Sequence, residues 1–121
     1  MPSLLRLLLL TVIAANFASA EHHAGHSIFN GKNLTGWSGD PTYWSVQDGV
    51  ITGQSTAAHP IEQNTFLIWK DRVADFEFTA EFKLTGETAN SGVQYRSKVI
   101  DASKWIAGGY QADMDYQTRY T

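Results

Sequence analysis

The sequence contains no cysteine, only four histidines, and no excess of positive charge. Without cysteine there can be no disulfide bond, no thiolate metal site and no lipid attached to a cysteine. With so few histidines, a nucleophilic triad is improbable, and neither a phosphate-binding glycine loop nor a Gly-x-Ser-x-Gly motif is present. Nine basic residues against twelve acidic ones give a formal charge of −3. This balance argues against nucleic acid or an anionic membrane surface as a partner.

The first 20 residues have the features of a secretory signal peptide. Arg6 supplies the positive charge, "LLLLTVIAA" is an apolar stretch too short to cross a bilayer, and Ala18-Ser19-Ala20 is a small-residue cleavage site. We therefore expect a secreted or periplasmic protein with no membrane segment after cleavage; a retained anchor is the less favoured alternative. Cleavage after Ala20 leaves 101 residues, with eight basic against twelve acidic side chains. A hydrophobic core would have to stabilise this product without disulfides.

Residues 21–27, "EHHAGHS", are expected to be a flexible start to the mature chain. Three of the four histidines lie here: His22, His23 and His26. They could bind a metal ion, but histidines at a frayed terminus are more often incidental.

From Ile28 onward the sequence is typical of short strands separated by turns. In "WSVQDGVITG", residues 44–53, the Asp48-Gly49 step between apolar alternations predicts a β-hairpin. In "DFEFTAEFKL", residues 75–84, apolar and polar side chains alternate, which predicts a half-buried strand. Further strands are expected over residues 65–70, buried on both faces, and over residues 90–97 and 110–116, with residues 101–109 as a connection.

This pattern predicts an all-β fold, an antiparallel sandwich or barrel, because no segment after residue 20 reads as an amphipathic helix. A sandwich usually needs about seven or more strands, and the sequence offers roughly six or seven, some of them weak. The chain also stops at "YQTRYT" with no closing turn. Residues 28–121 are therefore expected to be the N-terminal part of a longer, truncated domain.

A polar row in "NSGVQYRS" is the candidate site. Alternation along a strand predicts that Asn90, Gln94 and Arg96 share one face, with Gly92 leaving room for a ligand. If strands 76–84 and 90–97 are neighbours, their polar faces lie side by side. The full face would then also carry Glu77, Glu81, Lys83, Gln111, Asp113 and Asp115. The alternative is a solvated outer sheet face with no ligand.

Six motifs occur in the order found in the 3-keto-disaccharide hydrolase family, and the chain resembles that family from about Ile28 to its end. They are "SIFNGKNLTGW", "WSVQDGVITG", "TFLIWK", "DFEFTAEFKL", "NSGVQYRS" and "GGYQADMD". The resemblance implies a concanavalin A-like jelly-roll sandwich. It also implies a sugar or glycoside substrate that carries a ketone at C3.

Cleavage of such a substrate would begin with removal of the acidified C2 proton, after which the enolate expels the oxygen from C1. The resemblance implies Arg96 as the electrostatic stabiliser, and Glu81 or Asp113 as the acid–base group. Asn90, Gln94 and Gln111 would bind substrate hydroxyls. No cofactor is evident, although the resemblance allows a divalent metal ion as the electrophile.

The last motif departs from the commonest family form, Gly-Tyr-Glu-x-Gln-Ile. Here Gln111 and Asp113 exchange the positions of the acid and the amide. A noncatalytic, lectin-like carbohydrate-binding module on the same scaffold is therefore the second hypothesis. A structural or adhesive surface domain is the third.

Overall fold

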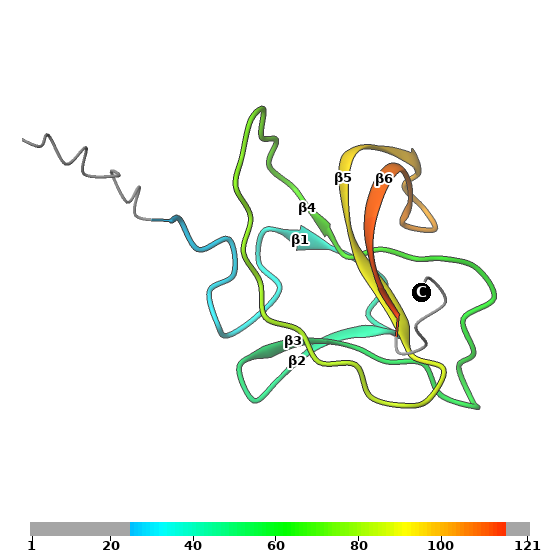
Figure 1. Cartoon of the computed structure of the whole chain (residues 1–121). Coiled ribbons are helices and arrows are strands. Elements are labelled where there is room, and N and C mark those ends of the chain that lie inside the picture. The colour runs from blue at the N-terminus through cyan, green and yellow to red at the C-terminus, as the bar shows by residue number, and fades with distance from the viewer. Residues whose placement is uncertain (1–24, 116–121) are drawn as a thin grey trace, which may run out of the picture.

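The computed structural model describes residues 25–115, and these residues form strands, turns and loops without a helix (Figure 1). The strands pair as three antiparallel two-stranded sheets. These are β1 (Trp37–Ser38) with β4 (Ile68–Trp69), β2 (Trp44–Gln47) with β3 (Val50–Gly53), and β5 (Asn90–Asp101) with β6 (Ile106–Asp115). The predicted all-β antiparallel class is confirmed, whereas the jelly-roll sandwich stays a prediction.

The predicted signal peptide (residues 1–20) and residues 21–24 lie outside the described part of the chain. Within residues 25–115 there is no helix long and apolar enough to cross a membrane.

The predicted hairpin over residues 44–53 is present, and its turn explains its register. Asp48 and Gly49 have φ values of 50° and 77°. Two successive residues with positive φ match the backbone twist of the flanking strands, as in a type I′ turn. Gln47 then pairs with Val50, and Trp44 pairs with Gly53.

The longest elements are β5 and β6, of 12 and 10 residues, which form one curved hairpin (Figure 1). The strands predicted within 90–97 and 110–116 are therefore confirmed, and both are longer than expected. Residues 101–109 are not simply a connection, because β6 already begins at Ile106. The turn is closed by Asp101, whose Oδ1 accepts hydrogen bonds from the Ser103 amide (2.9 Å) and hydroxyl (2.6 Å).

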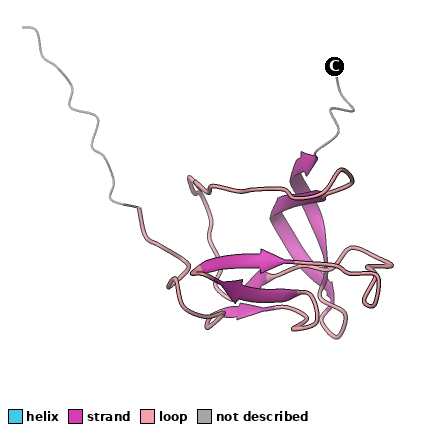
Figure 2. Ribbon diagram, turned by 90° about the horizontal axis from the view of Figure 1, so that it is seen from below, coloured by secondary structure: helices cyan, strands magenta, loops and turns pink. Residues whose placement is uncertain are grey.

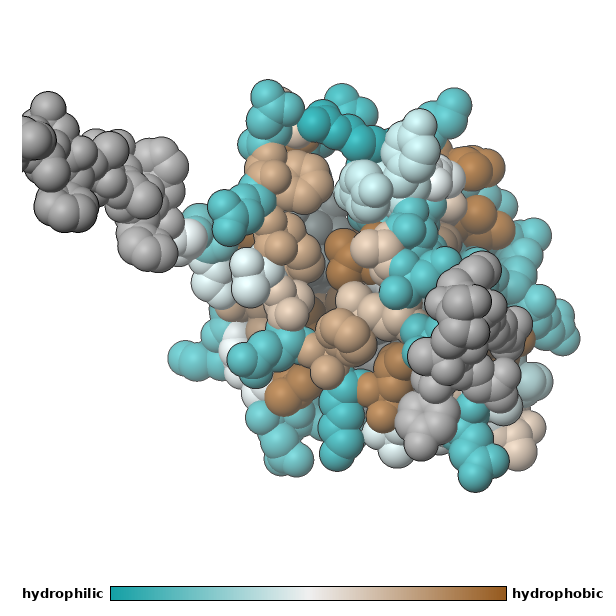
Figure 3. Space-filling view, in the orientation of Figure 1, coloured by the Kyte–Doolittle hydropathy of each residue, from teal (hydrophilic) through white to brown (hydrophobic). Residues whose placement is uncertain are grey.

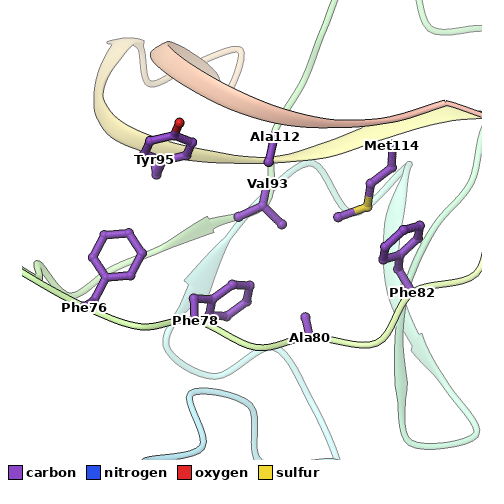
Figure 4. Close-up of a pocket in the computed structure, with 8 residues that line it drawn as sticks. All are labelled: Phe76, Phe78, Ala80, Phe82, Val93, Tyr95, Ala112 and Met114. Atoms are coloured by element: carbon purple, nitrogen blue, oxygen red, sulfur yellow. The ribbon is translucent and has the colours of Figure 1, made fainter. Parts of the chain in front are cut away.

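The prediction of a strand over residues 76–84, paired with residues 90–97, is wrong. The structure assigns no strand to this segment, and β5 pairs with β6. The segment instead runs opposite the hairpin, and its apolar side chains point toward those of the hairpin (Figure 4). Its alternating pattern places Phe76, Phe78, Ala80 and Phe82 on the side that points toward the hairpin, although these side chains remain largely exposed.

The layer between this segment and the hairpin is apolar. It holds a cavity of about 290 Å³ that is lined from both sides. The lining residues are Phe76, Phe78, Ala80 and Phe82 on the segment, and Val93, Tyr95, Ala112 and Met114 on the hairpin (Figure 4). No side chain within residues 25–115 is fully buried, and Phe82 is 63% exposed. Apolar surface is accordingly visible in the middle of the face shown in Figure 3.

Residues 65–70 are half-buried at most positions, and only Ile68 and Trp69 pair as a strand, so the expected burial on both faces is wrong. Hydrogen bonds tie this region to the turn of the β5–β6 hairpin. The Phe66 amide donates to the Trp105 carbonyl (3.0 Å), and Trp105 Nε1 donates to Ser38 Oγ (3.1 Å). The loop between β3 and β4 is thereby brought against that turn. Figure 2 shows how much of the described chain is loop between the short strands.

The β2–β3 turn requires glycine at position 49. We expect Gly49→Ala to lower the free energy of unfolding by about 1 kcal/mol, because an L-residue in the left-handed region is strained. Asp48→Asn should be neutral, because asparagine suits this turn. Gly25→Ala is the matched control, since a Cβ there meets no atom within 4 Å. Urea unfolding checks this; equal stability of Gly49→Ala and Gly25→Ala would contradict the turn geometry.

The pKa of Asp101 lies below its ordinary value, chiefly because the Ser103 hydroxyl donates a hydrogen bond to the carboxylate. Backbone bonds from Ser103 and Lys104 and the charge of Lys104 lower this pKa further, against the opposing effect of desolvation. A lowered folded-state pKa contributes stability above the unfolded pKa, and the contribution is lost as pH falls through the folded value.

We therefore expect Ser103→Ala to raise the Asp101 pKa toward its unfolded value, and so to reduce the part of the stability that is lost at Asp101 as pH falls. An NMR titration of the Asp101 carboxyl carbon measures this pKa. Ser91→Ala, on a serine elsewhere in the hairpin, is the control. An unchanged Asp101 pKa in Ser103→Ala would show that the hydroxyl has no such effect.

Candidate functional site

The polar face of the β5–β6 hairpin brings together four of the predicted site residues. Gln94 lies opposite Gln111, Gly92 lies opposite Asp113, and Asn90 lies opposite Asp115. The intervening pair, Val93 and Ala112, points toward segment 76–84 (Figure 4). Since successive side chains in a strand point to opposite faces, Asn90, Gln94, Gln111 and Asp113 share the other face. This part of the predicted row is confirmed as an arrangement, while the roles of its residues stay predictions.

The Asp113 carboxylate is held by its neighbour on the same strand. Gln111 Nε2 donates a hydrogen bond of 2.8 Å to Asp113 Oδ1. Gln111 extends across Gly92, where a Cβ atom would lie 2.7 Å from Gln111 Cγ. The room left by Gly92 is therefore occupied by the Gln111 side chain and not by open space for a ligand. The Gln111 amide orients the Asp113 carboxylate through Oδ1 and makes no bond to Oδ2.

Gln94 supplies an acceptor without a partner. Its Nε2 donates to the Ala107 carbonyl at 3.4 Å, which fixes the direction of the amide. Its Oε1 is buried and has no hydrogen-bond partner within residues 25–115. A buried acceptor without a donor is costly, and native structures seldom leave one unsatisfied. A ligand hydroxyl could reach this oxygen only if the Gln94 side chain moved, because the atom is buried.

Arg96 does not share this face in the predicted way, because a β-bulge interrupts the alternation after Tyr95. Arg96 and Ser97 both lie opposite Gly109, and Arg96 has a φ of 50°. Its Nη2 pairs with Asp75 Oδ1 at 3.1 Å. Asp75 immediately precedes the segment on the apolar side of the hairpin. The expectation that Arg96 projects together with Asn90 and Gln94 is therefore wrong, since one extra residue re-aims the strand.

Arginine is an unusual residue at the position of this bulge that has positive φ. Positive φ is uncommon for large residues, and such strain is found preferentially at functional sites. The Arg96 side chain is 54% exposed and that of Asp75 is fully exposed. Ion pairs at this exposure contribute little stability, so Arg96 can exchange Asp75 for another anionic partner at small cost.

Glu81 is not brought to Asp113. Its neighbours Ala80 and Phe82 both point toward the hairpin (Figure 4), so the alternation directs Glu81 to the other side of its segment. The predicted polar face shared by Glu81 and Asp113 does not exist, because the two segments lie in different layers.

Two features of this region were missed from the sequence: the pairing of Asp75 with Arg96, and the role of Gly109. A Cβ atom at Gly109 would lie 2.7 Å from Ser97 Cα. The Gly108-Gly109 pair inside a strand was the available signal, because glycine in a strand often marks a bulge or a close backbone approach.

The groups that this face does present, the carboxylate of Asp113 held by the Gln111 amide and the amides of Asn90 and Gln94, are of the kind that bind polyol hydroxyls. Within residues 25–115, no three His, Asp or Glu side chains gather into a possible metal-ligand set.

A protein-family model described as the 3-keto-alpha-glucoside-1,2-lyase-like domain matches residues 25–121. The chain belongs to this family, as its motifs predicted, and a carbohydrate-related function follows. No curated protein and no solved structure matches the chain.

The bulge should depend on Gly109. We expect Gly109→Ala to lower the free energy of unfolding by about 1–3 kcal/mol, because the new methyl group meets backbone that cannot move aside cheaply. Gly108→Ala is the matched control. Its Cβ would lie 2.6 Å from Ile100 Cδ1, the end of a flexible side chain, so its effect should be small. Chemical denaturation compares the two; a Gly108→Ala loss as large as that of Gly109→Ala would contradict the assigned bulge.

Proposed function

We propose that the chain belongs to an exported enzyme that cleaves 3-keto-glycosides by removing the C2 proton and eliminating the substituent at C1. The observation that carries the proposal is the Asp113 carboxylate, oriented by Gln111 on a face whose other groups suit sugar hydroxyls. Family membership supports the same substrate class.

In this reaction Asp113 takes the proton from C2, and the electron pair forms the C2–C3 enolate, with negative charge on the C3 oxygen. The enolate then reforms the C3 ketone while a C1=C2 double bond forms and the C1–oxygen bond breaks. The leaving oxygen takes up a proton. Water then adds across the double bond to give the free 3-keto sugar. Each proton removed is returned, so the sum is hydrolysis.

Arg96 is the proposed stabiliser of the enolate oxygen. It would have to leave Asp75, which its exposure permits. Gln94 Oε1 is the proposed acceptor for a substrate hydroxyl, with Asn90 at the end of the same face. Glu81 has no role here, because it lies in another layer. Asp115, next after Asp113 on the same face, is the proposed acid that protonates the leaving oxygen.

The proposal includes export through the predicted signal peptide and completion of the domain by strands beyond this chain. The exposed apolar face of segment 76–84, with Phe82 63% exposed, supports further covering structure. A lectin-like module is the second candidate, favoured by the exchanged positions of Gln111 and Asp113 relative to the commonest family form.

We expect Asp113→Asn to lower kcat on p-nitrophenyl 3-keto-α-glucoside by about 10²–10⁴-fold, the usual contribution of a general base. The substitution preserves shape and removes only the charge. Asp71→Asn, an exposed aspartate of the β4 flank, is the matched control and should leave kcat unchanged. The rate is measured with the full-length protein, as release of p-nitrophenol from the substrate.

Arg96→Ala should also lower kcat, while Arg72→Ala should not. Full activity in Asp113→Asn would refute the assignment of the base. Binding of the keto-glucoside by the unmodified protein without release of p-nitrophenol would refute catalysis and support the lectin-like module.

A further inference from the structure

A second, polar cleft lies at the turn end of the β5–β6 hairpin, away from the polar face that carries Asp113. Its volume is about 690 Å³. It is lined by residues of the loop between β3 and β4, of the β5–β6 turn and of the segment just before β2. The residues that matter for its chemistry are Tyr43, His59, Glu62, Gln63, Lys104 and Trp105.

The two aromatic rings of the cleft are fixed by hydrogen bonds from their polar atoms. Tyr43 Oη donates to the Pro60 carbonyl at 3.1 Å, and Trp105 Nε1 donates to Ser38 Oγ at 3.1 Å. These hydrogen bonds use the polar atom of each ring, so what the two rings can still offer a ligand is their carbon surface. Rings locked by such bonds are preorganised to stack on a ligand, without losing side-chain freedom on binding.

The polar side chains of the cleft are available. Those of His59, Glu62 and Gln63 form no hydrogen bond or ion pair with other residues in the described range 25–115. Together they offer both donors and acceptors, as a hydroxyl-rich ligand requires. Two carboxylates, Asp40 and Glu62, face a single ammonium group, that of Lys104. This balance disfavours an anionic ligand.

We propose that this cleft binds neutral saccharide, with pyranose units stacked on Trp105 and Tyr43 and hydroxyls bonded to His59, Glu62 and Gln63. Its volume lies within the range of small-molecule sites, roughly 300–1,000 Å³. The cleft needs no ketone and contains no part of the proposed catalytic face. It would hold an unoxidised sugar chain, so this inference does not depend on the proposed reaction.

Titration of the full-length protein with cellobiose and maltose, followed by ¹H–¹⁵N NMR, tests the proposal. Neither sugar carries a ketone, so neither can undergo the C2 elimination. We expect shifts at the Trp105 indole and at the amides of residues 59–63 with at least one of the two. Digalacturonate should bind about tenfold more weakly, because the cleft is net acidic.

Trp105→Ala should weaken binding of the better disaccharide about tenfold, and Glu62→Gln should weaken it measurably. Tyr110→Ala and Glu77→Gln are the matched controls, an exposed aromatic and an exposed carboxylate outside the cleft, and should bind normally. Because Trp105→Ala also removes a bond to Ser38, the exposed Glu62 variant tests the site without risk to the fold.

Three outcomes would each overturn the proposal. The shifts could be confined to the hairpin's polar face, neither disaccharide could cause shifts, or the control variants could lose as much affinity as the cleft variants. Digalacturonate binding as tightly as the neutral sugars would overturn its assignment to neutral saccharide. Loss of keto-glucoside cleavage in Asp113→Asn with disaccharide binding retained would separate this site from the catalytic one.

Discussion

The register of the β5–β6 hairpin is the constraint on which the rest of the structure depends. Because side chains alternate, the pairing of Gly92 with Asp113 and of Gln94 with Gln111 assigns every residue of both strands to a face. One face collects Val93, Ala112 and Met114 against segment 76–84. The other collects amides and a carboxylate. A slip of one residue would exchange the two faces, turning the polar groups toward segment 76–84 and the apolar ones away from it.

The bulge at Arg96 limits how far this pattern extends. It ends the polar face after Gln94 and turns the guanidinium toward Asp75, on the segment that covers the apolar face. The arginine thus lies between the two layers, in a strained backbone conformation that depends on the absence of a side chain at Gly109. The cost of that strain is understandable if the guanidinium serves the ligand-binding face when a ligand is present.

The features predicted correctly from the sequence are those that neighbouring residues determine by themselves. Two consecutive turn residues at Asp48 and Gly49 were enough to predict a hairpin, and the alternation in "NSGVQYRS" predicted which residues join Gln94. The strand over 76–84 was wrongly predicted, since the same alternation suits any segment with one packed side. The position of Arg96 was missed because a bulge is set by cross-strand packing between Ser97 and Gly109. The cleft at Trp105 brings together residues distant in sequence, which no local pattern reveals.

Two saccharide sites at opposite ends of one hairpin would suit an enzyme that holds a sugar chain at one place and acts on an oxidised unit at another. Both proposals rest on the hairpin register. The most direct test is to record nuclear Overhauser contacts between β5 and β6. The account predicts cross-strand contacts between Gly92 and Asp113 and between Gln94 and Gln111. Contacts joining Gly92 to Ala112 instead would mean a slipped register, and would contradict it.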